Sequence, residues 1–139
     1  MSKSVLLVLL VCFNLYASSI ESEKKIYKYL LHSIFPNKNI VKVWVDKKSK
    51  VPVLQNRNTE VVQNKNDADI LLLFYTKELQ TEKILFAGSY KVLKNYKNKA
   101  IGGFFWQKGR PNILFLKQNL EKEGVTLPLK LNKYIKEDL

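Results

Sequence analysis

Cysteine and histidine are almost absent from this chain. Its 139 residues include one cysteine, Cys12, and one histidine, His32. A single cysteine cannot form an intramolecular disulfide, so disulfide-stapled scaffolds are excluded and stability must come from a buried apolar core. Zinc and most transition-metal sites need several His or Cys ligands, which two such residues do not supply. We therefore expect no metal and no cofactor.

Long apolar runs are also scarce, and the longest one lies near the N-terminus. It extends from Val5 to Leu15, which is short of the roughly 20 residues that a helix needs to span a bilayer. A basic residue, Lys3, precedes the run and a small residue, Ala17, follows it, as in a secretory signal and its cleavage site. We predict that residues 1–17 are a cleaved signal peptide and that the protein is exported.

Two other interpretations of the N-terminus stay open. The apolar run could be a retained membrane anchor, or Cys12 could carry a lipid as in a lipoprotein. Val11 stands before Cys12, where lipoprotein signals have a small residue.

In the exported form, residues 18–139 are expected to form one domain with one core, because about 120 residues is an ordinary size for a single domain.

Acidic residues are few compared with basic ones. The chain has 24 Lys and Arg against 12 Asp and Glu, a net charge of +12, and loss of residues 1–17 leaves +11. Such a charge suits acidic neighbours, namely an acidic protein face or an anionic surface of the cell envelope such as lipid head groups. A secreted location argues against nucleic acid as the partner. The alternative is a compositional bias without functional meaning.

Apolar residues at helical or alternating spacing predict α and β elements in turn. A helix is expected from Ser18 or Ser19, which can cap its first turn, to Pro36, which stops it. Its apolar stripe consists of Ile26, Leu30, Leu31 and Ile34. Strands are expected where apolar residues alternate or form a short run, at residues 41–46, 70–74 and 84–87. A short helical stretch with Val92 and Leu93 follows the last of them.

These elements predict an α/β fold. Continuous apolar strands belong to sheets that are covered on both faces, so we expect a single domain with a mixed, mostly parallel sheet flanked by helices. A C-terminal β-hairpin and two further helices, at residues 119–123 and 127–135, complete it. Residues 47–66 fit no element clearly.

The stretch FFWQKGRPNILFL, residues 104–116, predicts the hairpin. Lys108 and Gly109 are the central residues of a tight turn, where glycine accommodates the positive φ that such turns need. The turn sets a register of four opposed pairs: Gln107 with Arg110, Trp106 with Pro111, Phe104 with Ile113, and Gly102 with Phe115. Both faces of the hairpin are apolar, so it must join the sheet or present one face to a partner.

The core interpretation of the hairpin places its apolar residues in the interior with those of the other strands. The predicted core residues are Val43, Ile70, Leu72, Phe104, Ile113 and Phe115. The tip differs, because Lys108 and Arg110, two cations one residue apart, cannot be buried unpaired. We predict that Trp106, Gln107, Lys108 and Arg110 form an exposed contact element for a partner. The alternative is a solvated hairpin end.

The C-terminal third also has a recognisable order of residues. It begins with two glycines and an aromatic residue, continues with a basic turn and an apolar strand, and ends with a leucine-bearing segment. The residues that make up this order are Gly102, Gly103, Phe104, Gly109, Arg110, Ile113, Phe115, Asn119, Gly124, Leu127 and Leu131. This order resembles the YfiR-like family of small periplasmic proteins, and the first helix, ending in IFP, and the segment ADILLLF are similar to that family too. The resemblance implies a regulator that binds the periplasmic domain of an inner-membrane signalling protein, such as a diguanylate cyclase or a sensor kinase. The cysteines that founding members use for redox response are missing here.

No residue pattern indicates catalysis. His32 stands alone, Ser89 lacks the nucleophile-elbow pattern, and Asp67 and Asp69 are more typical of a charged lead-in to a buried strand than of an acid pair. We therefore predict a protein that is not an enzyme. A small ligand-binding domain is the alternative, because backbone N–H groups at Gly88 and Ser89, before a helix, could meet an anion at the strand ends.

Export generates a direct prediction about the N-terminus. Protein recovered from an envelope fraction should have the intact mass of a chain that begins at Ser18, because the signal peptide has been removed. Mass spectrometry of the intact protein checks this. Recovery in the membrane of a chain that still carries residues 1–17 would contradict the predicted cleavage and favour the anchor.

Overall fold

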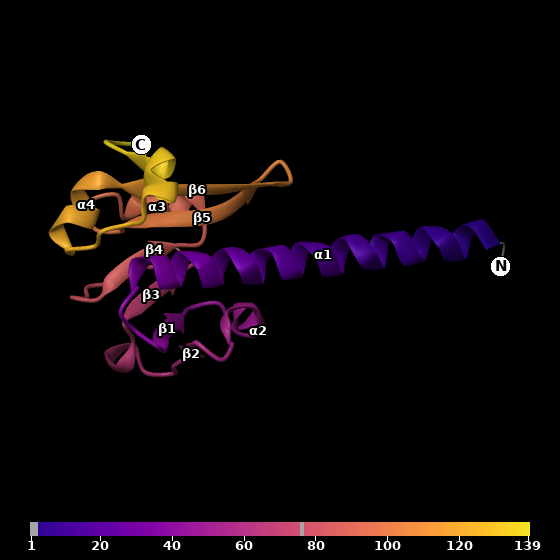
Figure 1. Cartoon of the computed structure of the whole chain (residues 1–139), viewed down its shortest axis with the longest axis horizontal. Coiled ribbons are helices and arrows are strands. Elements are labelled where there is room, and N and C mark those ends of the chain that lie inside the picture. The colour runs from indigo at the N-terminus through magenta and orange to yellow at the C-terminus, as the bar shows by residue number, and fades with distance from the viewer. Residues whose placement is uncertain (1–2, 76) are drawn as a thin grey trace.

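A seven-stranded sheet forms the centre of the domain, within the residues that the structure describes (Figure 1). The computed structural model describes residues 3–75 and 77–139, with side chains from Ser19 onward. The strands are β1 Val41–Val45, β2 Thr59–Val61, β3 Ile70–Leu73, β4 Ile84–Ala87, β5 Gly102–Gln107, β6 Arg110–Leu116 and β7 Ile135–Lys136. Their order in the sheet is β2-β1-β3-β4-β5-β6-β7. Neighbours are parallel except for the antiparallel pair of β5 and β6, which confirms the predicted mixed, mostly parallel α/β fold.

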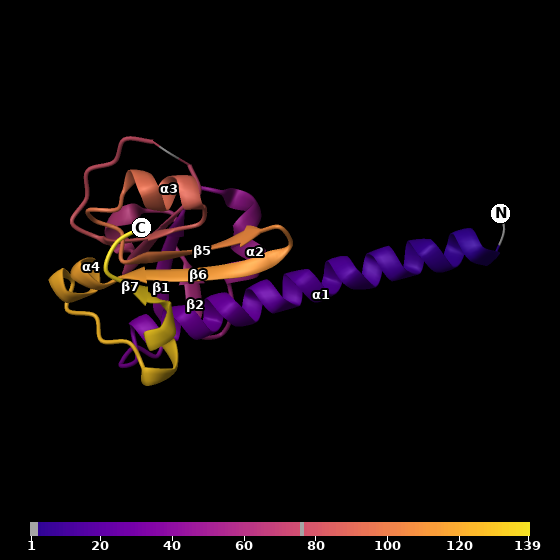
Figure 2. The ribbon, with the colours of Figure 1, turned by 90° about the horizontal axis from the view of Figure 1, so that it is seen from above.

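Helices cover both faces of this sheet (Figure 2). They are α1 Lys3–Ile34, α2 Val51–Leu54, α3 Tyr90–Asn95 and α4 Lys117–Lys122, together with the 3-10 helices η1 Lys48–Lys50, η2 Lys65–Asp67 and η3 Leu129–Tyr134. α1 lies across one face and α3 lies on the other. The elements η1, α2, β2 and η2 lie between residues 48 and 67, and thus account for most of the region 47–66, in which no element was predicted.

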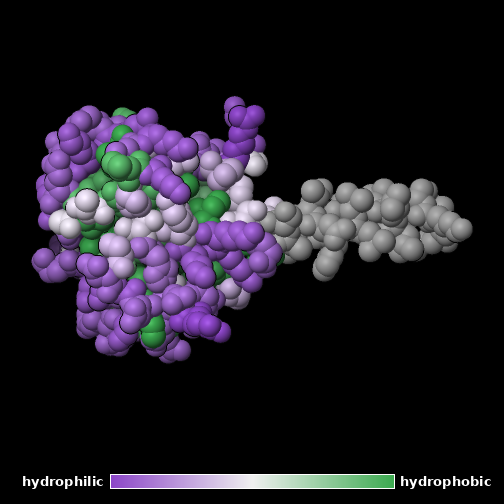
Figure 3. All heavy atoms as spheres, viewed as in Figure 1, coloured by the Kyte–Doolittle hydropathy of each residue, from purple (hydrophilic) through white to green (hydrophobic). Residues whose placement is uncertain are grey.

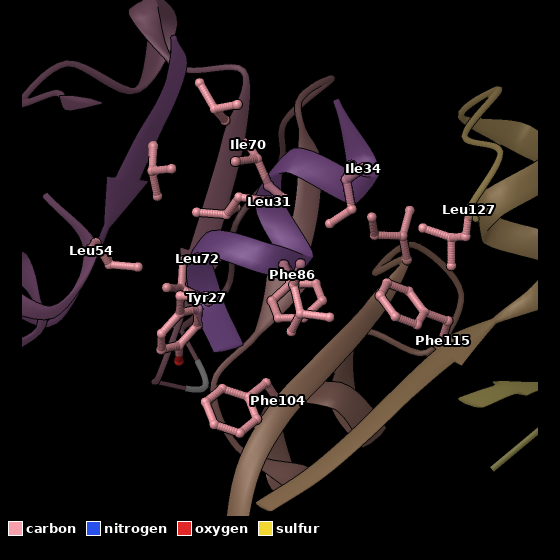
Figure 4. Close-up of a cluster of buried hydrophobic side chains, with 14 of the residues drawn as sticks. Tyr27, Leu31, Ile34, Leu54, Ile70, Leu72, Phe86, Phe104, Phe115 and Leu127 are labelled. Atoms are coloured by element: carbon pink, nitrogen blue, oxygen red, sulfur yellow. The ribbon is translucent and has the colours of Figure 1, made fainter. Parts of the chain in front are cut away.

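The larger apolar core lies between α1 and the sheet (Figure 4). Tyr27, Leu30, Leu31 and Ile34 face the sheet because they recur at helical spacing. Ile26 of the predicted stripe is only partly buried, and Tyr27 lies in the core instead. Five of the six predicted core residues are buried, namely Val43, Ile70, Leu72, Phe104 and Phe115. Ile113 is half-buried at the margin of the same core.

A second core fills the space between the sheet and α3. Val92 and Leu93 of α3 pack there with Leu71 and Leu85, which point to the opposite face of the sheet from their strand neighbours. Every residue of β3 is buried. This confirms that the continuous apolar run marks a strand covered on both faces.

The β5–β6 hairpin has the predicted register. Gln107 pairs with Arg110, Trp106 with Pro111, Phe104 with Ile113, and Gly102 with Phe115. Lys108 and Gly109 have φ values of 50° and 75°, as a tight hairpin turn requires. Because β5 also pairs with β4, the hairpin belongs to the main sheet.

The two ends of the chain differ from the sequence-based expectation. α1 is one helix from Lys3 to Ile34, so its start lies well before the predicted cap at Ser18 or Ser19. No helix in the described part of the chain has the length and apolar character that a membrane span needs.

At the C-terminus, the helix predicted over residues 127–135 is present as the shorter 3-10 helix η3, Leu129–Tyr134. Pro128 is extended, a 3-10 helix follows it, and Ile135 then pairs with Phe115 of β6. The physical reason is the open edge of β6, whose backbone groups would otherwise lack partners, so the chain forms the short strand β7 there. The other predicted helix is present as α4, which begins two residues earlier than expected and ends before Gly124 at φ 66°.

The hairpin's contribution to the core can be tested at Phe115. Phe115→Ala should lower the free energy of unfolding by about 3 kcal/mol, because the ring is fully buried and its removal leaves a cavity. Denaturant unfolding measures this. Leu129→Ala is the control, since Leu129 is 84% exposed, and it should change stability by less than about 0.5 kcal/mol. A similarly small change for Phe115→Ala would show that this face of the hairpin is not core.

Candidate functional site

The tip of the β5–β6 hairpin projects from the body of the domain, on the side toward which the N-terminal part of α1 extends (Figure 1). Gln107, Lys108 and Arg110 are exposed, and Trp106 is 40% exposed although its ring is large and apolar. Neither Lys108 nor Arg110 forms an ion pair with another described residue. The tip therefore offers two cations and an indole ring to the surroundings.

Trp106 is held by a chain of aromatic contacts that begins on α1. The rings of Tyr27 and Phe104 lie edge to face, with centroids 5.0 Å apart. The rings of Phe104 and Trp106 follow at 5.8 Å with a similar geometry. Because Tyr27 and Phe104 are buried, they fix the base of the tip and restrict the rotamers of Trp106.

A crevice of about 260 Å³ lies at the carboxyl ends of the central strands, next to the base of the tip. Its lining includes Trp106 of the predicted contact element and Gly88 and Ser89 of the predicted ligand site. The structure thus brings together two sites that the sequence treated separately. The reason is topological, because the carboxyl ends of parallel strands meet at one edge of a sheet.

Gly88 and Ser89 have structural roles in this crevice. The Gly88 N–H donates to the Leu73 carbonyl at 2.7 Å, and the Ser89 hydroxyl oxygen accepts from the Val92 N–H at 3.2 Å, which caps α3. A Cβ at Gly88 would lie 2.4 Å from the ring of Phe74, so glycine is needed for this close approach. The Gly88 N–H, which we expected to meet an anion, already has a partner within the domain.

An ion pair that the sequence analysis missed forms one wall of the crevice. Lys50 Nζ lies 2.6 Å from Glu23 Oε1, and the two side chains are 20% and 11% exposed. Lys50 and Lys47 also place their ammonium groups over the ring of Phe74, at 5.5 and 5.6 Å from its centroid. The pair joins α1 to η1 across 27 residues of sequence, so no local pattern could indicate it.

Tyr27 lies beside this ion pair, with 2% of its surface exposed. Burial raises the pKa of the Tyr27 phenol well above its ordinary value, and the nearby Glu23 carboxylate raises that pKa further. The phenol is therefore protonated over the whole physiological pH range.

The other titratable residues singled out in the sequence lie elsewhere. Asp69 accepts a hydrogen bond from the Lys42 N–H at 2.8 Å and pairs with Lys38 at 3.1 Å, so it supports the strand lead-in. Asp67 is exposed at the end of η2. His32 is half-buried on α1, and its Nε2 atom has no hydrogen-bond partner among the described residues. No group of three or more potential metal ligands occurs in the described ranges.

The raised pKa of Tyr27 generates a prediction about alkaline pH. An unfolded tyrosine ionises near pH 10, whereas the folded phenol stays protonated to higher pH, so wild-type stability should fall above about pH 10. Tyr27→Phe removes this loss and should gain about 1 kcal/mol relative to wild type between pH 8 and pH 11. Denaturant unfolding at the two pH values checks it. Tyr29→Phe, at an exposed position of α1, is the control and should follow the wild type; the same behaviour of Tyr27→Phe would contradict the prediction.

Comparison with models of protein families, with curated proteins and with solved structures found no match for this chain. The basis for a functional proposal is therefore the chemistry of its own surface, above all the hairpin tip and the crevices at the strand ends.

Proposed function

We propose that this protein is a non-catalytic regulatory protein of the periplasm that binds the periplasmic domain of an inner-membrane signalling protein. The observation that carries the proposal is the hairpin tip, where Lys108 and Arg110 are exposed beside the partly exposed ring of Trp106. The resemblance of residues 101–135 to the YfiR-like family supports the class of partner, a diguanylate cyclase or a sensor kinase.

The chemistry of the tip suits an acidic protein face. Arg110 can make a bidentate contact with a carboxylate, whereas Lys108 acts as a point charge. Trp106 supplies apolar area next to them, and large aromatic side chains are frequent energetic anchors of protein interfaces. The tip keeps its shape through the hairpin register and the aromatic contacts at its base, so little conformational entropy is lost on binding.

The wider surface is also suited to an acidic neighbour. Figure 3 shows a face covered mostly by hydrophilic residues, with apolar residues in scattered patches, and the chain has twice as many basic as acidic residues, 24 against 12. A positive field of this kind accelerates encounter with an acidic partner and makes association dependent on salt. An anionic envelope surface is a second neighbour that the same field would attract.

Regulation requires that binding favour one state of the partner. A regulator that binds the inactive conformation more tightly shifts the partner's equilibrium towards that conformation by its differential affinity. Release of the regulator would then return the signalling protein to its active state. The proposed exported form lacks Cys12, the one cysteine of the chain, so a thiol–disulfide change within that form would not control the release.

The double substitution Lys108→Glu with Arg110→Glu tests the role of the tip. It should reduce capture of membrane partners about tenfold and remove the salt dependence of capture, because it reverses the charge that meets the acidic face. The measurement is a pull-down from inner-membrane extracts at low and high salt. Stability should change by less than about 1 kcal/mol, because exposed charges contribute little to it.

A matched control makes the same change of charge away from the tip. Lys122→Glu with Lys130→Glu alters exposed residues of α4 and η3 and should leave capture close to wild type. If both double variants reduce capture equally, general charge attraction explains the binding. If the tip variant folds normally and recovers the same partners at the same yield, the tip is only a turn and the proposed contact is wrong.

A further inference from the structure

A second and larger hollow lies at the carboxyl ends of β1, β2 and β3. Its volume is about 770 Å³, which falls in the usual range of small-molecule sites, about 300–1,000 Å³. The 260 Å³ crevice next to the hairpin has a different lining, and Tyr75 is the one residue that borders both hollows. None of the residues that the sequence indicated as a site borders the larger hollow.

The topology of the sheet explains why a cavity forms here. The chain leaving β1 passes to β2 on the α1 face, where Leu54 of α2 joins the larger core. The chain leaving β2 passes to β3 on the opposite face, where Val62 and Ala68 join the second core. Strand order therefore reverses at β1, and open α/β sheets bind their ligands outside the carboxyl ends of the strands at such a point.

Asp46 organises this end of the sheet. It follows β1 directly, and its carboxylate accepts hydrogen bonds from the backbone N–H groups of Phe74 and Tyr75, at 2.8 and 3.2 Å. The carboxylate of Asp46 is thus hydrogen-bonded within the domain, and these two N–H groups already have an acceptor. Charge recognition in the cavity must come from side chains.

The charged side chains that border the cavity are three lysines, Lys48, Lys65 and Lys77, and two carboxylates, Asp46 and Glu78. Lys48 and Lys65 border the cavity, are exposed, and form no ion pair with any described residue. Lys65 places its ammonium group 5.0 Å from the centroid of the Trp44 ring. Trp44, half-buried, forms an apolar wall of the cavity together with Val62 and Leu73.

We propose that this cavity binds an amphipathic organic anion. An aromatic or aliphatic body would lie against Trp44, Val62 and Leu73, and a carboxylate or sulfonate group would meet Lys48 and Lys65. The ammonium group of Lys65 then exchanges its contact with the ring of Trp44 for a charge-assisted hydrogen bond to the ligand. The site does not depend on the proposed role of the hairpin tip.

The test uses Trp44 as the reporter. The chain has two tryptophans, so Trp106→Phe leaves Trp44 as the only one. We would titrate this variant with 8-anilinonaphthalene-1-sulfonate and follow energy transfer from Trp44 to the bound probe. N-phenyl-1-naphthylamine, which has the same rings without the sulfonate, is the matched neutral probe. The expected result is saturable binding of the sulfonate, about tenfold tighter than that of the neutral probe.

Substitution of the two lysines tests the charge recognition. In the Trp106→Phe background, Lys48→Gln with Lys65→Gln should weaken the sulfonate probe about tenfold and leave the neutral probe unchanged, while Lys122→Gln with Lys130→Gln should affect neither. Circular dichroism confirms that the variants fold. Absence of saturable energy transfer from Trp44 would overturn the proposal. So would an equal loss with the control pair, because it would show that only the overall charge attracts the probe.

Discussion

The packing of α1 against one face of the sheet is the interaction on which the rest of the structure depends. Tyr27, Leu30, Leu31 and Ile34 make up a single stripe of the helix and join the same core as the strand residues Ile70 and Phe115. Each fully buried side chain of this size contributes about 1.5–3 kcal/mol through removal of apolar surface from water. Without a disulfide, this burial is the main source of stability.

The same packing places the features to which we assign binding. α1 supplies Tyr27 to the aromatic contacts at the base of the hairpin tip, and it supplies Glu23 to the ion pair with Lys50. The hairpin is thereby fixed relative to the strand ends. Both proposed surfaces, the tip and the cavity at β1, β2 and β3, lie beyond the carboxyl ends of parallel strands, where loops can differ without disturbing the core.

The two proposals rely on different physics. At the tip, the exposed cations are solvated in the free protein. They should therefore affect the rate of encounter with a partner and the specificity of binding more than the stability of the fold. In the cavity, an apolar wall allows a ligand to bury surface, and the lysines at its border select for negative charge. A protein that combines both features can couple a small ligand to a protein partner, provided that the two sites bias the same conformational equilibrium.

Most of the strands and the hairpin register could be predicted from sequence, because they depend on local rules. Apolar residues at every second position predicted β1, and a short continuous apolar run predicted β3. The Lys108-Gly109 turn predicted the register of β5 and β6. Exposure of the tip followed from charge alone, since unpaired cations are not buried.

Only the tertiary structure decided the features that join distant segments. Ile135 pairs with the edge of β6 as a short strand, although the spacing of apolar residues over 127–135 predicted a helix that reaches Ile135. Asn119, buried on α4, donates to the carbonyls of Lys97 and Ala100 across about 20 residues of chain. The Asp46 bonds and the cavity beside them likewise depend on which strands become neighbours. Sequence by itself determined most of the strands and the hairpin, because propensity and periodicity act over a few residues, whereas the sites arise where strand order brings the ends of strands together.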